Sequence, residues 1–180
     1  RRNRRGSTAT SSRLCAAPMC ASRRSGHSAT GSCSVAIAPV SPADCARYCT
    51  AHGVDKKTAV LYSELFDGHI GTVLTAARDK ARTEQVDKAM ELARAAQAGD
   101  SYTAAVLLAP YEKDKAGAAA LLRDLRAVAA AGLQGSPHAP VQGQQAQRTL
   151  RLAEAAIQRL GAQVNPKITL SVLAMKFRTF

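Results

Sequence analysis

The spacing of apolar residues between positions 114 and 131 constrains the fold more than any other feature of the chain. They recur at intervals of three and four, at Ala118, Leu121, Leu122, Leu125 and Val128. Because a helix turns every 3.6 residues, these side chains form one stripe of an amphipathic helix. Hydrophobic residues make up 46% of the chain, many of them alanine, and only seven are Phe or Tyr. Such a composition favours closely packed helices over sheets, so we expect a mainly α fold.

Start and stop signals divide the ordered part of the chain into further helices. Ser41, Asp55 and Asn165 are typical N-cap residues, and Pro42 and Pro166 suit the first turn of a helix. The predicted helices run from Ser41 to about His52, from Asp55 to Asp67, from Gly68 or His69 past Leu74, from Thr83 to Gly99, from Asp100 or Ser101 to Pro110, from Asp114 to Ala131, from Gln144 to Leu160 and from Pro166 to Phe177.

Two of these helices carry the residues that we expect to form either the core or a subunit seam, since both need an apolar face. The first contributes Leu150, Ala153, Ile157 and Leu160. The second is capped by Asn165, and we expect it to bury Ile168, Leu170, Val172, Leu173 and Met175.

Charge divides the chain unevenly. Residues 1–40 contain seven arginines and no acidic residue, whereas the remainder has 18 basic and 13 acidic side chains. Residues 1–34 lack any apolar period, which predicts an irregular or disordered tail. An alternative is that this stretch is read out of frame. We therefore predict a basic tail at 1–38, with a short strand or extended segment at 35–38, a small helical unit at 39–98 and a helical bundle at 99–180.

Common catalytic and nucleotide-binding motifs are absent from the sequence. It has no GxxxxGK[ST] loop, no GxGxxG and no GxSxG. Its histidines, His27, His52, His69 and His138, are scattered, and none has an obvious Ser or Cys with an acidic partner nearby. We expect a non-catalytic chain without a cofactor.

Cys45, Cys49 and His52 are the one group with metal-ligand chemistry. On a helix the two cysteines share a face, and His52 follows about one turn later. The spacing is not that of a CxxC knuckle, and small cysteines are often buried in helices. We expect buried thiols and no metal, with a zinc site as the alternative.

The net charge of +12 makes nucleic acid a second candidate partner, chiefly through the arginines of the tail. This alternative describes a basic helical nucleic-acid-binding protein, although the helical part is only modestly basic and lacks interleaved aromatics. No secretory h-region precedes the cysteines, and no apolar run approaches the ~20 residues that span a membrane. We expect a cytoplasmic protein without a membrane partner.

The C-terminal sequence resembles the end of the delta-prime subunit of bacterial DNA polymerase III, part of the clamp loader. The similar segments are 152–157, Leu160 and 162–177, where the family has a long helix, an Asn-Val-Asn-like turn and a Leu-rich last helix. Gln163 replaces the first Asn of that turn. Residues 39–44 resemble the entry to the lid domain of an AAA+ subunit, and residues 68–74 resemble its Gly-x-x-Gly-Arg-Ala segment.

The resemblance covers about residues 35–180 and implies a lid domain followed by a collar domain. Thr72 stands where the family has the arginine of its Gly-x-x-Gly-Arg-Ala segment. Gly31-Ser32-Cys33 stands where the family has Ser-Arg-Cys, so Ser32 replaces the arginine finger. Either the arginine finger is missing or the sequence before about residue 33 is not the family's. The nucleotide-binding core of such a subunit would precede residue 1. The implied function is structural: the chain helps to hold together the loader that places the sliding clamp on primed DNA. The implied partners are the ATPase subunits and delta.

Overall fold

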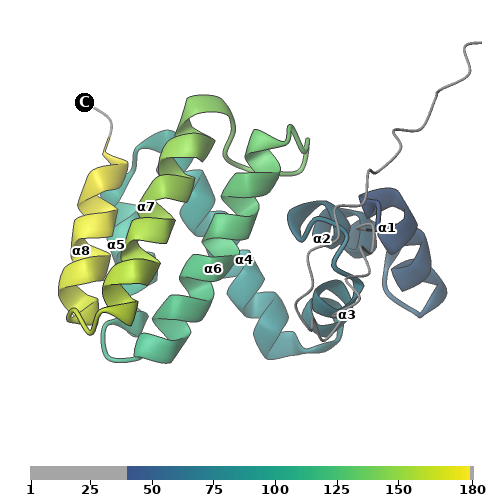
Figure 1. Cartoon of the computed structure of the whole chain (residues 1–180), viewed down its shortest axis with the longest axis horizontal. Helices are drawn as coiled ribbons and strands as arrows, with labels where there is room; N and C mark the ends of the chain where they lie inside the picture. The colour runs from purple at the N-terminus through teal and green to yellow at the C-terminus, as the bar shows by residue number, and fades with distance from the viewer. Residues whose placement is uncertain (1–39, 179–180) are drawn as a thin grey trace, which may run out of the picture. The chain divides into compact units, whose positions relative to one another are not determined.

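The computed structural model describes residues 40–178, which belong to one compact unit. These residues form eight α-helices and one 3-10 turn, without a β-strand (Figure 1). The elements are α1 (Pro42–Ala51), α2 (Lys56–Leu65), α3 (Ile70–Arg78), α4 (Lys80–Ala98), α5 (Ser101–Leu108), η1 (Ala109–Tyr111), α6 (Lys115–Leu133), α7 (Gly143–Gly161) and α8 (Pro166–Phe177). The prediction of a mainly helical chain is confirmed. The predicted tail and the segment at 35–38 lie outside the described residues.

Local capping explains most of the helix starts. The side chain of Ser41 accepts a hydrogen bond from the Asp44 amide, and Asp55, Asp100 and Asp114 cap α2, α5 and α6 in the same way. Asn165 accepts from the amide of Lys167 at the start of α8. Each cap satisfies an amide that the first turn of a helix leaves without a partner, so these boundaries follow from the sequence.

The predicted start of α4 at Thr83 is wrong. The helix begins at Lys80, because the carboxylate of Asp79 accepts from the Ala81 amide and caps it there. Asp79 also ends α3, so no loop separates the two helices. The hydroxyl of Thr83 instead donates to the carbonyl of Ala76, 2.7 Å away, and ties the first turn of α4 to the end of α3.

Helices α6, α7 and α8 lie side by side and form one layer of the C-terminal bundle (Figure 1). Helix α4 packs behind α6 and α7, and α5 packs against α8. Helices α1, α2 and α3 pack on one another, and α3 continues into α4. One apolar core runs through all of these helices. The predicted domain boundary between residues 98 and 99 stays a prediction. Helix α4, which ends at this boundary, contacts helices that precede it and helices that follow it in the sequence.

Close backbone contact joins the end of α6 to the segment that leads into α7. A Cβ atom at Gly132 would lie 1.9 Å from the carbonyl oxygen of Val141, so only glycine fits there. A buried ion pair fixes α6 against α4: both terminal nitrogens of Arg82 lie 2.5 Å from the carboxylate oxygens of Asp124. Burial raises the pKa of Asp124, while the Arg82 guanidinium opposes that rise.

The end of α7 explains the turn that precedes α8. The Val164 amide donates to the Arg159 carbonyl and the Gln163 amide to the Leu160 carbonyl, which is the Schellman arrangement. Gln163 takes the left-handed conformation, with φ of 63°, which favours glycine or asparagine. Helix α4 ends in the same arrangement with Gly99 in the left-handed position.

Candidate subunit interface

Helix α8 has apolar side chains on both of its faces. Leu170, Leu173 and Phe177 point into the core and are at most 3% exposed. On the opposite side, Ile168 and Met175 are 60% and 63% exposed. At 100° per residue, these two positions lie almost directly above one another along the helix. The outward face of α8 is therefore apolar although the core does not need it.

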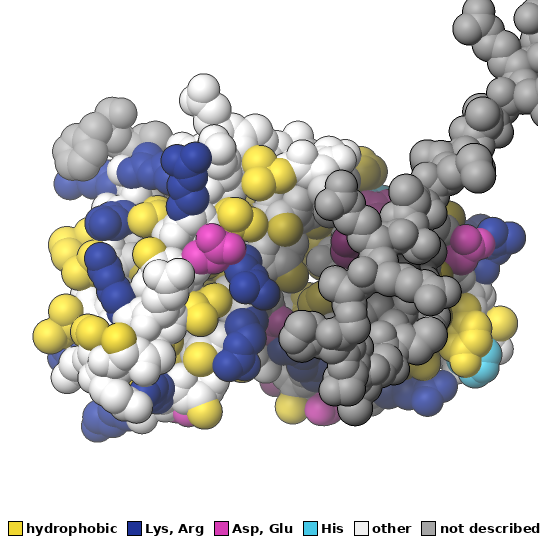
Figure 2. Space-filling model, viewed as in Figure 1, with side chains coloured by type: hydrophobic (Ala, Val, Ile, Leu, Met, Phe, Trp, Pro, Cys, Tyr) yellow, Lys and Arg dark blue, Asp and Glu magenta, His cyan; other side chains and the backbone are white. Residues whose placement is uncertain are grey.

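The neighbouring helix α5 has the same property. Ala104 and Leu108 are buried, while Tyr102 and Val106, one turn apart on the other side, are 78% and 55% exposed. Because α5 packs against α8, both helices at this end of the bundle present exposed apolar side chains. We name this the α5–α8 apolar surface, defined by Tyr102, Val106, Ile168 and Met175. Figure 2 shows apolar side chains at the edge of the molecule where α8 lies.

The structure separates the predicted seam residues into three groups. Ala153, Leu160 and Leu173 are buried in the core. Leu150 and Ile157 are half-buried and pack against that core. Asn165 caps α8, and Ile168 is exposed. Of these residues, Ile168 alone belongs to the α5–α8 apolar surface.

The prediction that Ile168 and Met175 are buried is wrong. Sequence reasoning treated every apolar residue of α8 as core and missed Tyr102 and Met175 as surface residues. A signal was present: the apolar residues of α8 surround the whole helix instead of forming one stripe. A helix that is apolar all round needs cover on all sides, and the fold covers one side of α8.

Cys45, Cys49 and His52 do not form a site together. Both thiols are fully buried, and burial together with the neighbouring Cys45 raises the pKa of Cys49. The imidazole of His52 is exposed and stacks on Tyr48, with ring centroids 4.0 Å apart. Across residues 40–178, no cluster of three His, Cys, Asp or Glu side chains could hold a metal ion.

A serine, a glutamate and a histidine meet between α2 and the segment that joins α6 to α7. We expected no histidine with a serine and an acidic partner nearby, and this is wrong for His138. Its acidic partner, Glu64, lies 74 residues away in sequence and meets it only in the folded chain. Ser136 Oγ donates to Glu64 Oε2 at 2.5 Å, and His138 Nδ1 lies 2.9 Å from the same oxygen.

This geometry differs from that of an activated nucleophile. An activated serine donates its proton to the imidazole, whereas the proton of Ser136 is directed at the carboxylate. Burial raises the pKa of Glu64, but hydrogen bonds from Ser136 and His138 outweigh it and hold the pKa below its ordinary value. The cluster ties α2 to the loop after α6.

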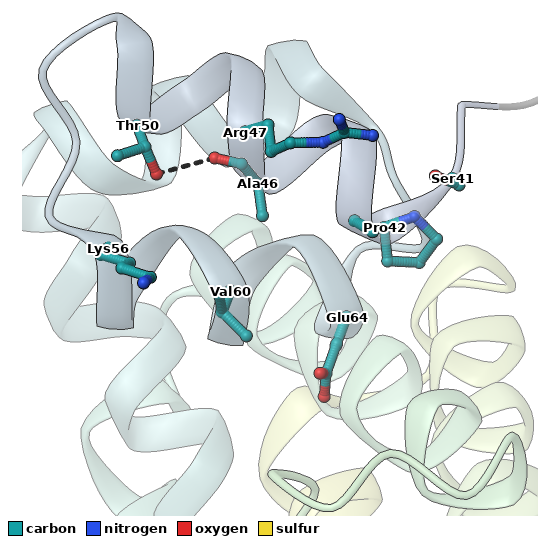
Figure 3. A pocket seen from close by; sticks show the side chains of 9 residues that line it. Ser41, Pro42, Ala46, Arg47, Thr50, Lys56, Val60 and Glu64 are labelled. Atoms are coloured by element: carbon teal, nitrogen blue, oxygen red, sulfur yellow. Dashed lines mark hydrogen bonds between the residues drawn. The ribbon is translucent and has the colours of Figure 1, made fainter.

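A groove of about 670 Å³ lies between α1 and α2 (Figure 3). Pro42, Ala46 and Val60 supply apolar walls, Arg47 and Lys56 lie at its rim, and Glu64 is its one carboxylate among the described residues. Arg47 is paired with Asp44, and Glu64 is held by Ser136 and His138. The lining therefore offers apolar contact and no pair of groups arranged for acid–base chemistry.

A second groove, of about 390 Å³, lies between α2–α3 and α6–α7 and includes Leu150, Thr72, Arg126 and Glu154. Across residues 40–178, no helix combines the length and the apolarity that crossing a membrane requires.

Comparisons with known proteins identify no relative of this chain. No family model matches the sequence, no curated protein is significantly similar to it, and no solved structure matches the fold.

Proposed function

We propose that the chain is a non-catalytic structural subunit of a bacterial clamp loader, similar to the delta-prime subunit of DNA polymerase III. Its α5–α8 apolar surface binds other subunits of the loader, namely the ATPase subunits and delta. Through that assembly it contributes to placing the sliding clamp on primed DNA in the cytoplasm.

One observation carries the proposal: the second apolar face of α8. Ile168 and Met175 are more than half exposed, although burying one such side chain contributes about 1.5–3 kcal/mol. With Tyr102 and Val106 on α5, they form an apolar surface of the kind that protein interfaces cover. Helix α8 also lies within the C-terminal segment, residues 152–177, that resembles the delta-prime family, so the resemblance includes the helix with the exposed face.

The packing supports a scaffold instead of an enzyme. The Ser136–Glu64–His138 cluster ties two segments together, and the two cysteines are buried. The α1–α2 groove lacks a pair of catalytic groups among its described lining residues. In contrast, α5 and α8 offer a contact surface with buried core residues beneath it.

The test mixes the full chain with the purified clamp-loader ATPase subunit from the same source and measures mass by size-exclusion chromatography with light scattering. We expect a mixed oligomer that Ile168→Asp and Met175→Asp weaken at least tenfold, since each places a charge in an apolar contact. Leu173 does not serve this test, because an aspartate at a position 3% exposed would unfold the bundle.

Leu133→Asp is the matched control. Leu133 is an apolar residue 46% exposed at the end of α6, outside the α5–α8 apolar surface. Circular dichroism establishes that each variant is folded. A folded wild-type chain that forms no mixed oligomer argues against the proposal, as does a loss of binding that is equal for Leu133→Asp and Ile168→Asp.

A further inference from the structure

Positive charge gathers on the layer formed by α6, α7 and α8. Residues 115–178 contain nine Lys and Arg side chains and two carboxylates. One of these carboxylates, Asp124, is buried and paired with Arg82, which leaves Glu154 as the exposed one. Figure 2 shows Lys and Arg side chains spread across this layer with few acidic ones among them. The layer is therefore far more basic than the average for the helical part of the chain.

The cations at the centre of this layer point away from the core. Arg123 on α6 and Arg151 on α7 lie opposite the buried side chains of their helices, and Arg159 borders the crevice between α7 and α8 together with Lys176. All three are exposed, as is Lys176 at the end of α8. We name these four residues the α6–α8 basic face.

These cations are without acidic partners in the part of the chain that the structure describes. Arg47, Arg82 and Lys167 each pair with a carboxylate, but no such pair involves a member of the α6–α8 basic face. Residues 1–39 and 179–180 contain no Asp or Glu side chain either. Like charges on one face of a protein raise the local positive potential, which favours binding of an external polyanion.

We infer that the α6–α8 basic face binds the phosphate backbone of nucleic acid, a function that goes beyond subunit assembly and does not depend on it. The surroundings of the cations favour this ligand over an anionic membrane. Gln144, Gln147 and Gln158 lie on the same exposed side of α7 and can donate to phosphate oxygens. Within residues 40–178, the large exposed apolar side chains of this layer lie away from the arginines of α6 and α7: Leu133 ends α6, and Ile168 and Met175 lie on the outward side of α8.

The face is distinct from the α5–α8 apolar surface, which lies on the outward sides of α5 and α8. Arg148 is not part of it, because its guanidinium donates to the carbonyl oxygens of Lys176 and Arg178, at 2.7 and 3.4 Å, and holds the end of α8. A protein partner on α5–α8 and a nucleic acid on α6–α7 can therefore be tested separately.

The test measures binding of the full chain to a fluorescent 20-base-pair DNA duplex by anisotropy, at several salt concentrations. The variant carries Arg123→Gln, Arg151→Gln and Arg159→Gln. Each phosphate contact makes the fall of log K with log salt steeper by about 0.9. At 0.1 M salt, relative to 1 M salt, this corresponds to about eightfold in affinity for each contact. For the loss of three contacts, we expect the salt dependence to become shallower by about 2.7 in slope and the affinity to fall about 100-fold or more.

The matched control carries Lys56→Gln, Lys57→Gln and Arg94→Gln, which remove the same charge from exposed positions on α2 and α4. The arginines of residues 1–40 are present in both variants, so any binding by them cancels in the comparison. Equal losses in the two variants would overturn the inference. It would also be overturned if the variant with Arg123→Gln, Arg151→Gln and Arg159→Gln lost binding to phosphatidylserine vesicles while its binding to the duplex stayed unchanged.

Discussion

Truncating two apolar residues of the same helix should give very different losses of stability. Leu173 and Ile168 both lie on α8, but Leu173 is 3% exposed and Ile168 is 60% exposed. Leu173→Ala removes buried methyl groups and leaves a cavity, which costs about 3 kcal/mol in the free energy of unfolding. Full burial of an isoleucine contributes about 2–3 kcal/mol, so Ile168→Ala, which loses part of a 40% burial, should cost about 0.5–1 kcal/mol.

Urea denaturation followed by circular dichroism measures both values. With a slope of about 1.5–2 kcal/mol/M, Leu173→Ala should lower the midpoint by about 1.5–2 M and Ile168→Ala by about 0.3–0.7 M. The comparison must use the isolated chain, because a bound partner would bury Ile168 as well. Equal losses for the two variants, or a larger loss for Ile168→Ala, would refute the assignment of the two faces of α8.

Three further predictions concern the packing of other segments. Gly132→Ala should destabilise the fold by about 2 kcal/mol or more, because the new Cβ would meet the Val141 carbonyl. The Cβ of Gly161→Ala would meet nothing within 4 Å, so this variant should stabilise α7 by about 0.5 kcal/mol. Thermal unfolding compares the two variants. Gln163→Asn should raise the free energy of unfolding by about 0.5 kcal/mol, since asparagine tolerates φ of 63° better, and a lower melting temperature would contradict this. The pKa of Glu64 is depressed in the folded chain, so the ionised carboxylate contributes stability above the ordinary pKa of 4.5. This stability is lost as pH falls through the lower folded pKa. In urea titrations at a series of pH values, Glu64→Gln should therefore lose less free energy of unfolding on acidification than the wild type.

The positions of the helices could be predicted from the sequence because their signals are local. An N-cap residue and the amide that it accepts from are two or three residues apart, as at Ser41 and Asn165. The start of α4 was harder, because Asp79 serves as the end of one helix and the cap of the next. A boundary without a loop lacks the turn residues that usually mark it.

The surfaces could not be predicted because they depend on contacts between distant segments. The apolar residues of α8 are consistent with core on either side, and only the packing of α5 and α7 decides which side is buried. The contact of Glu64 with Ser136 and His138 joins residues more than 70 positions apart, and no periodic pattern reports it. Similarly, the sequence reports the total charge, while the folded chain concentrates the unpaired cations on α6–α8.

Site-specific photocrosslinking tests the central claim most directly. A photoreactive phenylalanine analogue replaces Met175 in one sample and Leu133 in the other, and each full chain is irradiated with the assembled clamp loader from the same source. If the outward face of α8 binds loader subunits, position 175 should crosslink to an ATPase subunit or to delta, and position 133 should not. Crosslinking that is absent at both positions, or equal at both, would contradict the account.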